Sequence, residues 1–247
     1  MKIAFDDAGS GDPPLLFVHG WCCDRSYFAP QVEHFGRSHR VVAVDQRGHG
    51  TSDAATDGDY SVAAFAADAV ELIADLALDR PIVVGHSLGG VIALAVGASR
   101  PELVRGVVMV DPAPIVVSDE MRAMFGSIVD MVGTVEGRKG FVAGMFAPSD
   151  DEARKARIID GMSAMADDVA QAALVGLIDF DGPAALRACA VPIATIGSLS
   201  PTNTQADFMA HCPHMLVAQT LGAGHFNQLE VPDQVNAMIE QFLRLLP

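Results

Sequence analysis

The pentapeptide Gly85-His86-Ser87-Leu88-Gly89 places a serine where its hydroxyl could act as a nucleophile. It follows the apolar run 81–84 and opens into the apolar stretch 91–96. A buried strand that turns sharply into a helix exposes the central serine, and flanking glycines let the strand and the helix pass closely. A serine hydroxyl is a poor nucleophile at neutral pH until a base removes its proton, so this pattern also predicts a basic residue nearby.

Eight histidines could supply that base, and their context favours His225. It lies in the glycine-rich loop 222–226, after the last predicted strand and before the last predicted helix, where it can reach the same sheet edge as Ser87. His19 and His86 come directly after strands, and we expect them to orient backbone or to shape the substrate pocket. The other histidines lie in polar or turn-like segments and are expected at the surface: His34, His39, His49, His211 and His214.

Short apolar runs alternate with helical patterns along most of the chain. The clearest helical patterns cover residues 62–76 and 235–246. The predicted strands are 15–18, 41–44, 81–84, 106–110, 191–196 and 215–218. Buried strands that alternate with helices predict an α/β fold with a mostly parallel, doubly wound sheet that is covered on both faces.

The alternation stops between residues 112 and 190, which we predict to be a helical cap inserted into a core domain of residues 1–111 and 191–247. One apolar stripe recurs in the cap at helical spacing: Met121, Met124, Phe125, Ile128 and Met131. The stripe either packs the cap onto the core or lines an adaptable apolar pocket, and both roles remain open. Met124 and Phe125, together with His86, are the candidate pocket residues.

Composition limits the classes of partner. The 247 residues fit one large domain, and a net charge of −15 argues against nucleic acid and anionic membranes, so a small-molecule substrate is expected. No apolar run approaches the roughly 18 residues that span a bilayer, and acids close to Met1 interrupt any signal-peptide pattern, so a cytoplasmic location is expected. The four cysteines show no metal or disulfide spacing, and we expect neither a metal nor a cofactor. The oligomeric state stays open.

Over essentially its full length the chain resembles the α/β-hydrolase fold superfamily. The matching pieces are His19-Gly20-Trp21, Asp45-Gln46-Arg47-Gly48-His49-Gly50-Thr51-Ser52, Gly85-His86-Ser87-Leu88-Gly89-Gly90 and Gly224-His225 with Glu230-Val231-Pro232. The resemblance implies a nucleophile–acid–histidine site on an α/β-hydrolase sheet. It also implies an oxyanion hole formed by the backbone N–H groups of Trp21 and Leu88. Asp45 and Arg47 are interpreted as residues that fix a turn.

The acid of this site departs from the usual pattern of the superfamily. Most members carry an aspartate three residues after the glycine that ends the penultimate strand, and this chain has Ser200 there, after Gly197. A second arrangement in the superfamily puts the acid directly after the strand that follows the nucleophile helix, where this chain has Asp111. We therefore predict Asp111 as the acid, with Asp207 as the reserve candidate.

A serine nucleophile argues against the epoxide hydrolases and haloalkane dehalogenases of the superfamily, which place aspartate there. The expected reaction is acyl transfer, with hydrolysis of a small to medium apolar ester or lactone through an acyl-enzyme. A carbon–carbon bond hydrolase and a cofactor-free haloperoxidase or perhydrolase would use the same residues. A ligand-sensing receptor with slow hydrolysis is the alternative from another class.

Overall fold

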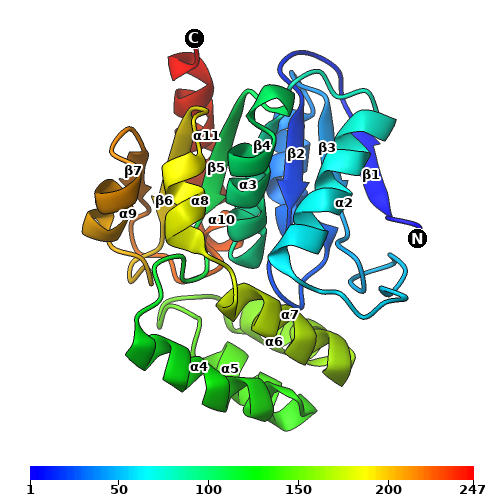
Figure 1. The fold of residues 1–247 in the computed structure, drawn as a ribbon, viewed down its shortest axis with the longest axis vertical. Coiled ribbons are helices and arrows are strands. Elements are labelled where there is room, and N and C mark those ends of the chain that lie inside the picture. Colours follow the sequence, from blue (N-terminus) through cyan, green and yellow to red (C-terminus); the bar gives the residue numbers. More distant parts are fainter.

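Seven strands form one sheet in the order β1-β3-β2-β4-β5-β6-β7 (Figure 1). The computed structural model describes residues 1–247, apart from the side chain of Asp119. The strands are β1 (Phe5–Ala8), β2 (Leu15–Val18), β3 (Val41–Val44), β4 (Ile82–His86), β5 (Gly106–Val110), β6 (Ile193–Gly197) and β7 (Leu216–Gln219). β1 runs antiparallel to β3, and every other pair of neighbours is parallel. The predicted α/β class with a mostly parallel sheet is confirmed.

Every residue of strands β2 to β6 is buried, which is why these strands consist of apolar runs. The six strands expected from those runs are present, with some bounds shifted slightly. The sequence pattern missed β1, whose residues Phe5, Asp6, Asp7 and Ala8 are all exposed. An exposed edge strand does not need an apolar face, so β1 carries no periodic signal.

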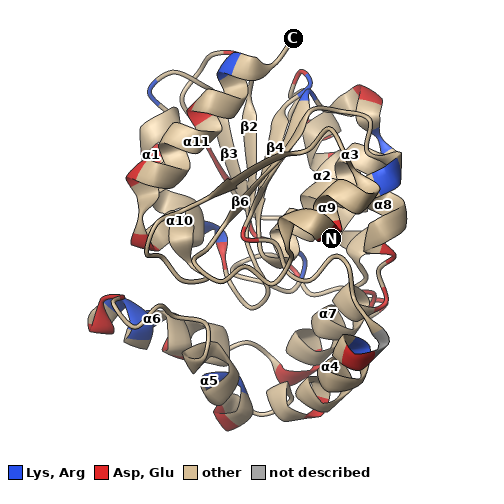
Figure 2. Cartoon of the chain, turned by 90° about the vertical axis from the view of Figure 1, so that its left-hand side faces the viewer, with Lys and Arg blue, Asp and Glu red and all other residues tan. Residues whose placement is uncertain are grey.

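Helices cover both faces of the sheet and separate two apolar cores. The helices are η1 (Arg25–Phe28), α1 (Ala29–Phe35), α2 (Val62–Asp75), α3 (Leu88–Ser99), η2 (Pro101–Leu103), α4 (Asp119–Val132), α5 (Val135–Ala143), α6 (Glu152–Ser163), α7 (Asp167–Ile178), α8 (Gly182–Ala188), α9 (Gln205–His211), α10 (Asn227–Glu230) and α11 (Pro232–Leu245). α1 and α11 pack together on one face, while α2, α3 and α8 pack together on the other (Figure 2).

Helices α4 to α7 form a separate layer below the sheet in the view of Figure 1. This layer is the helical part of the segment that we predicted as a cap, but α8, also inside 112–190, packs against α3 of the core. The buried guanidinium of Arg138 joins the helices of the layer, because it donates to the carbonyls of Val132, Ser163 and Met165. No single helix in the described chain is long and apolar enough to cross a membrane, and only the bent pair α7 and α8 would pass on length and composition.

Candidate active site

Ser87 occupies a sharp turn between β4 and α3. Its backbone angles are φ 54° and ψ −119°, a conformation that residues other than glycine rarely adopt. The turn brings backbone so close that a Cβ on Gly85 would lie 1.9 Å from the Gly89 carbonyl oxygen, and a Cβ on Gly89 would lie 2.0 Å from that of Val18. Only glycine fits at both positions, and the strained turn leaves Ser87 in the lining of a cavity.

Asp111 and His225 are in direct contact although 114 positions separate them in the chain. His225 Nδ1 lies 2.7 Å from Oδ2 of Asp111. The other carboxylate oxygen, Oδ1, accepts a 2.8 Å hydrogen bond from the backbone N–H of Ser198. Asp111 itself has a positive φ of 37°, and its N–H donates to the Ile196 carbonyl, so the strained residue is tied to β6.

The reserve candidate Asp207 serves a different purpose. Its carboxylate accepts hydrogen bonds from the backbone N–H and the hydroxyl of Thr204 in a capping box at the start of α9. The structure therefore brings Asp111, and not Asp207, to His225.

Asn203 holds the chain that leaves Asp111. Its side-chain amide donates to the carbonyls of Pro112 and Ala113 at 3.0 and 3.1 Å, and its Oδ1 accepts from the Ile115 N–H at 2.7 Å. Asn203 is buried, and these three bonds fix the segment 112–115 against the loop after β6. Sequence reasoning missed this residue, because nothing in the pattern of loop 198–204 distinguishes one polar residue from another.

Trp21 and Leu88 lie at two strand ends beside Ser87. Trp21 follows β2, and Leu88 is the first residue of α3. In the described part of the chain, neither backbone N–H donates to a protein acceptor. The Trp21 indole also donates a 2.8 Å hydrogen bond to the Ala170 carbonyl of α7 and packs edge-on against Phe141 of α5. Trp21 thus joins this part of the core to the helical layer.

His86 does not line the cavity, contrary to our expectation. It is 1% exposed, and its Nε2 lies 2.8 Å from the carbonyl oxygen of His225. Its ring packs against the ring of His225 with 4.8 Å between the centroids. Burial and the neighbouring His225 hold the pKa of His86 well below its usual value, so His86 is neutral and orients the His225 loop.

His19 and His49 are also buried behind the site, and the surface position expected for His49 is wrong. Their rings pack at 5.2 Å, and Nε2 of His19 accepts from the Gln46 N–H. Burial lowers the pKa of His19 to about 3, and burial also lowers the pKa of His49. Both side chains are therefore neutral, and each makes a hydrogen bond to a nearby backbone carbonyl, that of Gly20 for His19 and that of Arg47 for His49.

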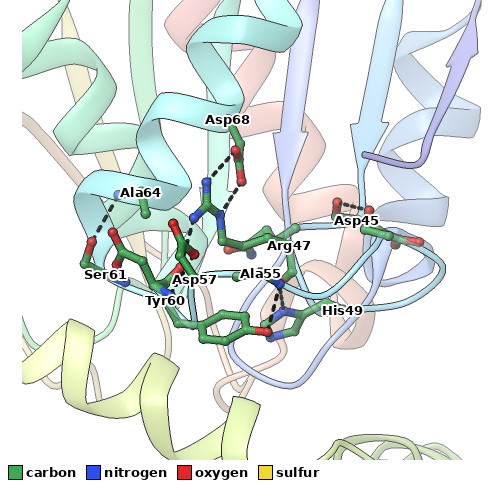
Figure 3. A network of polar contacts seen from close by, with 12 residues as sticks. Asp45, Arg47, His49, Ala55, Asp57, Tyr60, Ser61, Ala64 and Asp68 are labelled. Carbon is green, nitrogen blue, oxygen red and sulfur yellow. Dashed lines mark hydrogen bonds and ion pairs between the residues drawn. The ribbon is translucent and has the colours of Figure 1, made fainter. Parts of the chain in front are cut away.

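Asp45 and Arg47 fix the loop that follows β3 (Figure 3). The buried carboxylate of Asp45 accepts hydrogen bonds from the backbone N–H groups of Arg25 and Thr51, and it pairs with the Arg25 guanidinium. Arg47 makes a two-pronged ion pair with Asp68 of α2, each bond 2.6 Å long. Neither residue lines the cavity, which fits the expected role in fixing a turn.

The cavity between the sheet and the helical layer has a volume of about 630 Å³. Ser87, Asp111 and His225 line one side, and α4 contributes Met124 and Phe125. Met124 is 53% exposed, whereas Phe125 is only 8% exposed. Of the predicted stripe, Met124, Phe125 and Ile128 line the cavity, whereas Met121 and Met131 do not. Among the described lining residues there is no lysine or arginine, and Asp111 is the only carboxylate. The cavity is therefore apolar and holds no cation that could bind an anionic substrate.

Known proteins resemble this chain in sequence. A family model for the alpha/beta hydrolase fold matches residues 13–148. The chain is 38% identical over 118 residues to the 2-(acetamidomethylene)succinate hydrolase of Mesorhizobium japonicum, a match that covers 48% of this chain and 42% of that relative. The chain thus spans less than half the length of this curated relative.

Two solved structures resemble the whole fold. A thermophilic esterase from Thermogutta terrifontis is 25% identical with a TM-score of 0.82, covering 98% of this chain and 93% of the esterase. The enol-lactonase from Burkholderia xenovorans is 20% identical with a TM-score of 0.84, covering 98% and 96% of the two chains. The family model extends over more than half of the chain, from before β2 to beyond α5, and the chain belongs to the alpha/beta hydrolase fold family.

Proposed function

We propose that this protein is a serine hydrolase that cleaves a small to medium, uncharged ester or lactone through an acyl-enzyme. The observation that carries the proposal is the 2.7 Å contact between Asp111 and His225, beside Ser87 in the same apolar cavity. A carboxylate on Nδ1 holds the imidazole in the tautomer whose Nε2 can take a proton. The esterase from Thermogutta terrifontis, with which the chain shares its fold, supports the same reaction class.

The proposed reaction begins when Ser87 Oγ attacks the carbonyl carbon and His225 Nε2 takes the hydroxyl proton. Asp111 stabilises the imidazolium, and the N–H groups of Trp21 and Leu88 hold the negative oxygen of the tetrahedral intermediate. His225 then protonates the leaving oxygen as its bond to the carbonyl carbon breaks, which leaves Ser87 acylated. The alcohol of an ester departs at this step, whereas that of a lactone stays attached to the acyl chain. A water molecule gives a proton to His225 and attacks the acyl carbon. Collapse of the second intermediate releases the acid, and His225 returns its proton to Ser87 Oγ, which restores both residues.

The charge of the cavity argues for an uncharged substrate. A succinate derivative, as named for the Mesorhizobium relative, carries carboxylates at neutral pH, and the described cavity offers no lysine or arginine to pair with them. Burying an unpaired carboxylate beside Asp111 would cost several kcal/mol. We therefore assign this chain a neutral, largely apolar acyl group.

Two measurements test the proposal. Wild type is assayed with matched aryl esters whose acyl chains differ only in a terminal methyl or carboxylate group. We expect kcat/KM to be roughly 10²-fold higher for the neutral ester. Turnover confined to the charged ester would contradict the neutral substrate class, and a single burst without steady-state turnover would favour a ligand-sensing receptor.

The second measurement compares two serines of the same cavity. Ser87→Ala is expected to lower ester turnover by roughly 10³-fold or more while the protein stays folded. Ser200→Ala, a change of the same size in the cavity lining, is expected to leave turnover close to wild type. A serine-directed phosphonate should label wild type at Ser87 and leave Ser87→Ala unlabelled. Full activity of Ser87→Ala would refute the proposed nucleophile.

A further inference from the structure

One end of the sheet is almost free of charge. Residues 188–229, which form β6, α9 and β7, contain Asp207 as their only aspartate, glutamate, lysine or arginine, in a chain with a net charge of −15. Figure 2 looks onto this end of the molecule and shows α9 and β6 largely in tan. Two copies of so acidic a chain repel each other, and a surface with so few charges adds little to that repulsion.

The outermost strand at this end has an open edge. In the described structure β7 pairs with β6 alone. The Thr220 N–H donates to the Gly197 carbonyl, and backbone groups alternate in direction along a strand, so the N–H and C=O groups of Val217 and Gln219 point away from β6. Apolar side chains surround this free edge: Leu216 is 46% exposed, Val217 38% and Leu221 82%.

The opposite edge of the same sheet is protected. β1 is exposed and includes Asp6 and Asp7, whose carboxylates pair with Arg25 at 2.9 Å and Arg40 at 2.7 Å. Charged side chains on an edge strand discourage pairing with another chain. β7 has the sequence Leu-Val-Ala-Gln and lacks this protection entirely.

We propose that the edge of β7 binds the same strand of a second copy, which gives a two-fold dimer with a sheet continuous across both subunits. In antiparallel pairing, the free backbone N–H and C=O groups of Val217 and Gln219 in one copy bond to those of the same residues in the other copy. The interface is therefore self-complementary. The uncharged surroundings allow two acidic subunits to approach there. A charged or polar partner protein would find no complementary charge on this surface.

The dimer would lie next to the active-site cavity. Leu199 lines the cavity and is 54% exposed, and its carbonyl accepts a hydrogen bond from the Gln219 side chain at the end of β7. Pairing at β7 would therefore cover apolar surface at the rim of the cavity as well as the strand edge.

The test compares the two edges of the sheet with matched substitutions. Val217 on β7 and Phe5 on β1 are 38% and 37% exposed, so Val217→Glu and Phe5→Glu add the same charge at equally exposed edge positions. Light scattering with size exclusion should give wild type twice the monomer mass of 25.9 kDa. Val217→Glu should raise the dimer dissociation constant roughly tenfold or more, because the two-fold places the new charges close together. Phe5→Glu should leave it unchanged.

Hydrogen exchange provides a readout that does not require a variant to fold. The Val217 and Gln219 amides should exchange more slowly at high than at low protein concentration, while the β1 amides should show no such dependence. A wild-type monomer at about 100 µM, equal dimerisation of Val217→Glu, loss of the dimer in Phe5→Glu, or open-ended larger assemblies would each overturn the proposal.

Discussion

The backbone N–H of Ser198 donates a 2.8 Å hydrogen bond to Oδ1 of Asp111, the carboxylate whose other oxygen contacts His225. Ser198 follows β6, and Asp111 follows β5, so two adjacent strand ends support one charge. The loop after β6 is where the superfamily usually carries the acid. In this chain that loop instead supplies a backbone N–H that binds the carboxylate of an acid from the neighbouring strand.

The acid is tested by two isosteric changes. We expect Asp111→Asn to reduce kcat for ester hydrolysis by roughly 10²-fold or more with little loss of thermal stability, because the amide keeps the shape but not the charge. Asp207→Asn is the matched control and should leave kcat nearly unchanged, since its carboxylate caps α9. Steady-state kinetics and thermal unfolding of both variants decide the matter. A large loss of kcat in Asp207→Asn with little change in Asp111→Asn would instead assign the acid to Asp207.

Moving the acid back to the usual position should restore activity. Ser200 lines the same cavity as His225, so we expect Ser200→Asp in the Asp111→Asn background to recover at least roughly tenfold of the lost kcat. The same Ser200→Asp change in otherwise wild-type protein should not raise kcat, because Asp111 already occupies Nδ1 of His225. Equal activity of the double and single variants would show that the relocated carboxylate cannot reach the imidazole.

Phe125 and Met124 are neighbours in α4 that should respond differently to truncation. Phe125 is 8% exposed and lines the cavity, so Phe125→Ala should enlarge the cavity and shift kcat/KM toward longer acyl chains. Met124 is 53% exposed at the same cavity, and Met124→Ala should change the profile less. A series of aryl esters of increasing chain length measures this. An unchanged profile combined with lower stability would mean that Phe125 only packs the helical layer.

Glu230 should make stability depend on pH with an unusual sign. Burial raises the pKa of this carboxyl above its usual 4.5, and the nearby Asp150 raises it further. Because the folded pKa exceeds the unfolded pKa, the contribution of Glu230 to stability is complete below pH 4.5 and is lost as the pH rises through the folded value. Glu230→Gln should therefore unfold at a higher temperature than wild type at pH 7. The difference in unfolding temperature between Glu230→Gln and wild type should shrink as the pH falls toward 4. The glutamine side-chain carbonyl can still accept the hydrogen bond from the Gly224 N–H that Glu230 accepts in wild type.

Glu240 provides the control of opposite sign. Its hydrogen bond with His34 lowers the pKa of the Glu240 carboxyl, so its contribution to stability is present at neutral pH and is lost as the pH falls through the folded value. Glu240→Gln should thus be no more stable than wild type at pH 7, and it should converge with wild type in acid. Thermal unfolding between pH 4 and pH 8 measures both variants. A higher unfolding temperature for Glu240→Gln at pH 7 would contradict this assignment.

Local patterns predicted those elements whose burial is visible in the sequence. The apolar runs of β2 to β6 show as strands because both faces of the sheet are covered, and the elbow around Ser87 shows because only glycine fits at 85 and 89. The exposed strand β1 and the buried His49 were misjudged for the converse reason. An edge strand needs no apolar pattern, and a polar ring can be buried when hydrogen bonds satisfy it.

The sequence by itself determined the strands β2 to β7, the nucleophile turn and the short set of residues that could complete the site, because each depends on local backbone geometry or on an apolar run. Tertiary structure alone decided the pairing of Asp111 with His225, the support from Ser198 and Asn203, and the packing of α8 with the core. It also decided which strand edge is left open at β7. These contacts join residues that lie far apart in the chain, and their distances are fixed by how strands and helices pack rather than by any local pattern.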